Sequence, residues 1–208
     1  MRMDTPKHPS KSGYRLPAEW EPHEATWLSW PKRCSRSYPD PYYDPVLPSY
    51  CRLIEVLADN EWVNICVDSE EEESQVRSTL TRRGVHSKSI RFHWFPTEEP
   101  WCRDHGPVFM KKGDSSSESL CIINWEFNSW GGKYPPWEKD NQIPALVADF
   151  LDIPCASPKI TLEAGAIDTN GNGVLITTES CLLHPNRNRN MTKSRMEEIL
   201  NSYLGASH

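Results

Sequence analysis

VLPSYCRLIEVLA (residues 46–58) is followed after three residues by WVNICV (62–67), and these two neighbouring segments decide the fold class. In the first segment the apolar positions 47, 50, 53, 54 and 57 recur every three or four residues, which predicts an amphipathic helix. The second segment is predicted as a strand. A helix that leads directly into a strand indicates an α/β protein.

The same alternation extends to both sides of this pair. Ser69 opens an acidic run, and Val76 and Leu80 follow at helical spacing, which predicts a capped helix over 69–83. Residues 1–13 are expected to be a disordered leader. The other expected elements are strands over 25–30, 89–95, 121–127 and 173–178, and helices over 143–151 and 191–204, the last ending before Gly205. Together they predict repeated α/β units of roughly 60 to 80 residues.

Composition narrows the classes of partner. A chain of 208 residues that is 37% hydrophobic is long enough to bury a core. Its net charge of −6 argues against nucleic acid or an anionic membrane, and it suits a small cationic ligand. Seven cysteines at irregular spacing indicate reduced thiols and a cytoplasmic protein. The alternative to a cytoplasmic location is an organelle reached through a presequence that has been removed.

The segment with the highest concentration of reactive and charged side chains is WCRDHGP (101–107). We expect Asp104 on a loop beside the aromatic plane of Trp101, an arrangement that can hold a planar cation such as a guanidinium. The alternative is an internal ion pair between Asp104 and Arg103, with the tryptophan in the core. Cys102, in the same motif, is expected to be an inert thiol, and His23 and His105 are the histidines with the most aromatic or acidic neighbours.

Two further segments carry candidate site residues. In LEAGAID (162–168), Glu163 is one acid in an apolar run, so it needs a partner. It either orients a histidine base or bonds backbone amides at a strand end. In FNSWGGKY (127–134), the loop either brings Trp130 and backbone amides near a ligand or is a structural turn.

The segment from 168 to 179 also has the spacing of a calcium-binding loop. Flanking prolines and β-rich sequence contradict the helices that such a loop requires. The two Asn-Gly steps between apolar runs predict a hairpin turn instead.

Five motifs in order resemble the agmatine deiminase and bacterial-type peptidylarginine deiminase family. They are PAEWEPHEATWLSWP (17–31), WCRDHGP (101–107), NWEFNSWGGKYPP (124–136), LEAGAIDTNGNG (162–173), and TTESCLL (177–183) with NRN (186–188). The resemblance covers nearly the whole chain from Tyr14 to Gly205.

This resemblance implies an α/β propeller of the pentein type, of which residues 14–208 would form about two to three of five ββαβ units. It implies conversion of agmatine to N-carbamoylputrescine and ammonia, in polyamine biosynthesis, without a metal or a cofactor. By motif match Asp104 would hold the guanidinium, Trp101 and Trp130 would line the substrate pocket, and Glu163 would hold the catalytic histidine. In this family a cysteine thiolate attacks the guanidinium carbon.

The chain departs from the family in several places. The family's catalytic histidine, its second guanidinium-binding aspartate and its nucleophilic cysteine follow the point that corresponds to His208. We therefore expect these 208 residues to be inactive alone, and to form a homo-oligomer or pair with a C-terminal half. Ala164 replaces a glycine and Arg189 a proline. The alternatives are a non-catalytic guanidine-binding or interaction module, or a peptidylarginine deiminase.

Overall fold

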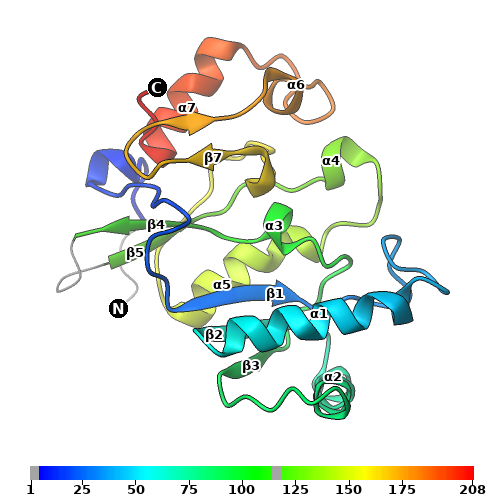
Figure 1. Ribbon diagram of the computed structural model, residues 1–208. Helices are drawn as coiled ribbons and strands as arrows, with labels where there is room; N and C mark the ends of the chain where they lie inside the picture. The colour runs from blue at the N-terminus through cyan, green and yellow to red at the C-terminus, as the bar shows by residue number, and fades with distance from the viewer. Residues whose placement is uncertain (1–4, 114–118) are drawn as a thin grey trace. The chain divides into compact units, whose positions relative to one another are not determined.

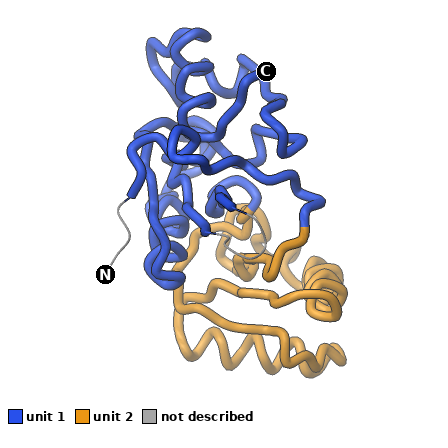
Figure 2. Tube along the Cα trace, turned by 90° about the vertical axis from the view of Figure 1, so that its left-hand side faces the viewer, with its two compact units in different colours: residues 1–21, 103–208 blue, residues 22–102 orange. Residues whose placement is uncertain are grey.

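The computed structural model describes residues 5–113 and 119–208, which form two compact units (Figure 2). Unit 1 comprises residues 1–21 and 103–208, and unit 2 comprises residues 22–102. Each unit has its own sheet and its own hydrophobic core.

Unit 2 is a three-stranded parallel sheet with two crossover helices (Figure 1). Its elements are β1 (Ala25–Ser29), α1 (Tyr43–Ala58), β2 (Trp62–Cys66), α2 (Glu70–Arg82) and β3 (Ile90–His93), with sheet order β1-β2-β3. All five predicted elements of this unit are confirmed, although α1 begins three residues earlier than expected.

The apolar patterns explain how unit 2 packs. Helix α1 buries Leu47, Cys51 and Ile54, and α2 buries Val76 and Leu80. Both sets join one cluster with alternate strand residues, so both helices cover the same face of the sheet. Helix α2 begins where predicted: Ser69 Oγ accepts a hydrogen bond from Glu72 N at 3.3 Å, which caps the first turn.

Unit 1 contains a mixed sheet of β4 (Val108–Lys112), β5 (Ser119–Ile123) and β6 (Cys155–Ala156). Strand β5 runs antiparallel to β4 and parallel to β6. The expected strand over 121–127 ends four residues early, because β6 is only two residues long and offers a short ladder. A single bridge from Glu126 to Thr161 continues the pairing.

The longer helices of unit 1 follow the sequence closely. Helix α5 (Ile143–Leu151) has the predicted bounds. Helix α7 (Lys193–Leu204) begins two residues late, at a Thr192 cap, and ends at Gly205 with φ 75°. The predicted hairpin forms between β7 (Asp168–Thr169) and β8 (Leu175–Ile176). The short helices are η1 (Ser10–Ser12), α3 (Cys102–His105), α4 (Ser129–Gly132), η2 (Asp140–Gln142), η3 (Ala164–Ala166) and α6 (Glu179–Leu182).

The expected leader falls partly outside the described residues, which begin at residue 5. In its described part, Ser10 opens η1, and its Oγ donates to the carbonyl groups of Asn201 (2.7 Å) and Ser202 (2.8 Å). Among the described helices, none is both long enough and apolar enough to cross a membrane. All seven cysteines are free thiols.

Candidate functional site

Asp104 lies on α3, a single helical turn between Pro100 and Pro107. The predicted loop is instead this short helical turn, because a proline shortly before a helix and another shortly after it both suit a short helix. The expected alternative, a pair between Asp104 and Arg103, also differs from the structure: Arg103 pairs with Glu19. Asp104 itself is half-buried and faces other partners.

Trp130 is presented by an unusual turn. All four residues of Ser129–Gly132 have positive φ, including 52° at Ser129 and 57° at Trp130. A non-glycine residue in this region costs about 1–3 kcal/mol, and such strain clusters at functional sites. Asn128 stabilises the turn, because its Oδ1 accepts from Gly131 N at 2.9 Å. The turn directs the Trp130 indole N–H into a hydrogen bond with Asp104.

Glu163 is fully buried and pairs with Arg187. The Arg187 Nε donates to both carboxylate oxygens of Glu163, at 2.8 and 3.0 Å. The exposed fractions of the two side chains are 11% for Arg187 and 2% for Glu163. A carboxylate this deep requires such a cation. Neither interpretation of Glu163 from the sequence had named Arg187.

The backbone at Gly165 approaches Asp104 closely. A Cβ atom added there would lie 2.2 Å from Asp104 Oδ1, which no side chain could occupy without displacing the carboxylate. Gly165 therefore provides a close backbone approach directly after Ala164, the position at which the family has a glycine. Its position, two residues after Glu163, was the only sequence signal for this role.

The electrostatics of Asp104 reflect these neighbours. Burial raises the pKa of the Asp104 carboxyl, and the charge of Glu163 raises that pKa further. The Trp130 hydrogen bond and the charges of Arg103 and Arg187 lower it. Two carboxylates share the site with the partly buried Arg187, so the group as a whole favours one additional cation.

The remaining predicted residues are placed differently. Trp101 belongs to unit 2, where its indole Nε1 donates to Ser37 Oγ at 2.6 Å. His105 is buried in unit 1, with its ring 5.8 Å from that of Phe127. His23, in unit 2, contacts Glu61 at 2.6 Å. Of the sequence candidates, Asp104, Trp130 and Glu163 are thus brought together within one unit.

The buried thiols do not favour nucleophilic chemistry. Burial raises the pKa of the Cys66 thiol to about 12 and that of Cys121 to about 11. A thiol with so high a pKa holds its proton at neutral pH and is a poor nucleophile.

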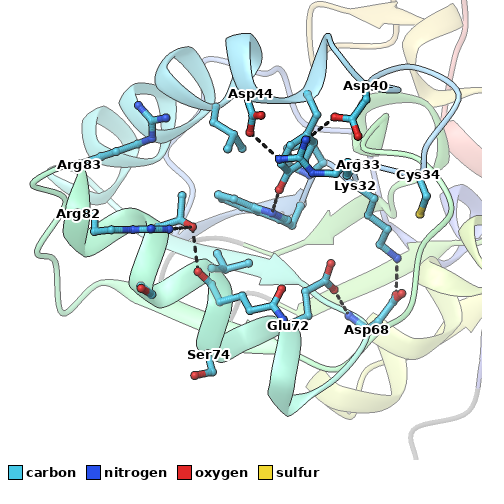
Figure 3. A pocket seen from close by; sticks show the side chains of 18 residues that line it. Lys32, Arg33, Cys34, Asp40, Asp44, Asp68, Glu72, Ser74, Arg82 and Arg83 are labelled. Carbon is cyan, nitrogen blue, oxygen red and sulfur yellow. Dashed lines mark hydrogen bonds and ion pairs between the residues drawn. The ribbon is translucent and has the colours of Figure 1, made fainter.

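A cavity of about 1230 Å³ lies elsewhere, in unit 2 (Figure 3). It is lined by charges of both signs, and several of them pair with one another. Arg33 contacts Asp40 and Asp44, while Lys32 contacts Asp68. The cavity contains none of the residues predicted as site residues from the sequence.

The chain is similar to proteins of known name over nearly all of its length. It is 32% identical over 206 residues to the agmatine deiminase of Medicago truncatula, covering 95% of this chain and 53% of the relative. It is 33% identical over 206 residues to that of Pseudomonas aeruginosa, covering 94% and 52%. The chain therefore spans about half the length of the curated relatives it matches.

Solved structures give the same picture. The agmatine deiminase of Enterococcus faecalis superimposes with a TM-score of 0.87 at 26% identity, over 100% of this chain and 55% of that one. A substrate-bound agmatine deiminase of C. jejuni superimposes with a TM-score of 0.78 at 25% identity, over 93% and 54%.

The Porphyromonas-type peptidyl-arginine deiminase family matches this chain over residues 15–208. That match includes both carboxylates, the strained Trp130 turn and Arg187. The chain therefore belongs to the Porphyromonas-type peptidyl-arginine deiminase family.

Proposed function

We propose that this chain is the guanidinium-binding part of an agmatine deiminase-type hydrolase that acts in the cytoplasm. The observation that carries the proposal is the grouping of Asp104 and Glu163 with the Trp130 indole and the partly buried Arg187. A planar cation can donate two parallel hydrogen bonds to a carboxylate such as Asp104. Relatives named agmatine deiminase favour the small free substrate over a peptide.

In the proposed reaction, a guanidine is hydrolysed to a ureido group and ammonia. Asp104 binds the guanidinium, and the hydrogen bond from Trp130 fixes the direction of that carboxylate. Glu163 is held in place to orient a histidine. The nucleophile is a cysteine thiolate in the remainder of the family's pentein fold, whose number of units we propose to be five.

We further propose that the 208 residues alone bind agmatine but do not hydrolyse it. None of the seven cysteines lies in the sequence context of the family's nucleophile, and burial raises the thiol pKa of Cys66 and of Cys121, which disfavours their thiolates. Removing a covalent nucleophile costs on the order of 10⁴ to 10⁶ in rate. Pairing with a C-terminal half, or self-association, would restore a closed site.

Ammonia release from agmatine tests this proposal. The chain is measured alone and then joined to the C-terminal half of a full-length relative such as the agmatine deiminase of Medicago truncatula, with an Asp104→Asn variant of the joined protein as control. We expect release only from the joined protein with Asp104 intact. If the folded joined protein releases no ammonia from agmatine, the proposed activity is wrong. If it releases ammonia from a peptidylarginine substrate instead, the substrate class is wrong.

A further inference from the structure

The segment Asn186–Arg187, which follows α6, contacts both sides of the candidate site. Neither residue was predicted from the sequence to have a role of its own. On one side the segment reaches Glu163, and on the other it reaches the strained turn that carries Trp130.

The contact with Glu163 uses one nitrogen of Arg187. The single Nε–H is shared between both carboxylate oxygens, so the carboxylate points its two oxygens at Arg187 in a charge-assisted bond. Arg187 also extends past Glu163, since its Nη1 lies 3.9 Å from the position that a Cβ on Gly131 would occupy. The same side chain therefore lies against the strained turn.

The contact with the turn runs through Asn128. Its Nδ2 donates to the Asn186 carbonyl at 2.9 Å, while its Oδ1 holds Gly131 N. A Cβ on Gly131 would lie 3.0 Å from the Cβ of Asn186, so the two segments are in close contact. The turn in turn directs Trp130 toward Asp104.

From this geometry we infer that Arg187 is a positioning residue: it orients Glu163 and balances its charge, so that Glu163 can hold the histidine while Asp104 receives the guanidinium. The inference rests on the proposed function, in which Asp104 receives the substrate and Glu163 orients the histidine. Arg187 itself has no contact with the reacting atoms in this scheme.

The charges around Asp104 support this role. Glu163 raises the pKa of Asp104, and Arg187 lowers it. The other charged group that affects Asp104 is Arg103, whose partner is Glu19. On the segment of Arg187 itself, His184 is exposed and its Nδ1 accepts from Asn186 N. Removing the Arg187 charge therefore leaves two carboxylates competing for one proton.

The test is a carboxyl NMR titration of the 208-residue chain as wild type, Arg187→Met and Arg187→Lys. We expect the Asp104 midpoint to move to higher pH in Arg187→Met and to return toward wild type in Arg187→Lys, which keeps the charge. Arg189→Met is the matched control, because it removes the same charge from an exposed position two residues away. It should leave the Asp104 midpoint unchanged.

Agmatine affinity provides the second readout. At neutral pH, Arg187→Met should weaken binding by about 10- to 100-fold, the range for losing a hydrogen bond to a buried charged group. The loss should grow as the pH falls, which a merely structural defect would not produce.

Three outcomes separate the two claims. An unchanged Asp104 midpoint in a folded Arg187→Met variant overturns the inference about Arg187. If the Asp104 midpoint shifts in Arg187→Met but the wild-type chain binds no agmatine, the inference about Arg187 stands and the proposed function is overturned. If Arg187→Met does not fold, Glu163→Gln replaces it: the Asp104 midpoint must then move to lower pH, and an unmoved midpoint overturns the inference.

Discussion

Replacing Gly165 by alanine is the smallest change that tests the geometry of the site. The added Cβ would lie 2.2 Å from Asp104 Oδ1, whereas ordinary contact begins at 3.4 Å. The carboxylate must therefore move by about 1.2 Å out of line with a bound guanidinium, and losing a hydrogen bond to a charged group costs up to about 100-fold in affinity. That factor corresponds to about 2.7 kcal/mol of binding free energy.

The backbone tolerates this substitution, because the φ of Gly165 lies outside the left-handed region. At a compatible position, Gly→Ala raises the free energy of unfolding by about 0.4–1 kcal/mol, because alanine lowers the conformational entropy of the unfolded chain. This gain offsets part of the cost of the clash. We therefore expect a folded variant with a displaced carboxylate. Loss of function through unfolding would be visible as a lower melting temperature.

The assay is isothermal calorimetry with agmatine, combined with urea unfolding of the same preparations. Ala166→Gly is the matched control, since it alters the same 3-10 turn without placing an atom beside Asp104. The expected result is an affinity loss of up to roughly 100-fold in Gly165→Ala alone. Wild-type affinity in a folded Gly165→Ala variant would refute the placement of Asp104 at the ligand.

Three further predictions concern charge and capping. Asp104→Asn should abolish agmatine binding and yet raise the free energy of unfolding at pH 7. The reason is that burial raises the pKa of Asp104 above its model-compound value of 3.8. The stability that the protonated carboxyl contributes is therefore lost as the pH rises through the folded pKa. A variant that is equally or less stable in urea would contradict this prediction. Burial lowers the pKa of His93 from 6.5 to about 4, so the free energy of unfolding should fall as the pH decreases from 6.5 to 4. In urea titrations His93→Gln should flatten this pH dependence. An unchanged slope would contradict the role of His93. Ser69→Ala should cost about 1 kcal/mol, the typical value for a lost N-cap, measured by chemical unfolding with Thr192→Ala as the matched cap on α7; a cost near zero at Ser69 alone would argue against its role.

Much of the fold could be predicted because it depends on local pattern. The apolar spacing predicts both α2 and α5, and the start of each is marked by a capping serine in α2 and by an N-terminal proline in α5. All of these signals lie within about a dozen residues. Strand β5 was predicted too long because its end is set by the length of β6, which lies about thirty residues further along the chain.

The candidate site was predictable only in part. Asp104, Trp130 and Glu163 stand out as polar or aromatic residues in unusual contexts, so the sequence could nominate each of them. Arg187 could not be nominated, since an arginine on a polar segment is ordinary until its Nε is seen on a buried carboxylate 24 residues away. The left-handed turn that directs Trp130 is likewise a backbone property that the Gly131-Gly132 pair permits but does not require.

The most direct measurement is a calorimetric titration of the 208-residue chain with agmatine and, in parallel, with putrescine. Putrescine is a diamine that lacks the guanidinium group, so the comparison isolates the contact assigned to Asp104. We expect saturable binding of agmatine, no comparable binding of putrescine, and loss of the agmatine signal in Asp104→Asn. Equal binding of both ligands, or agmatine binding that survives Asp104→Asn, would contradict the assignment of Asp104 as the residue that binds the guanidinium.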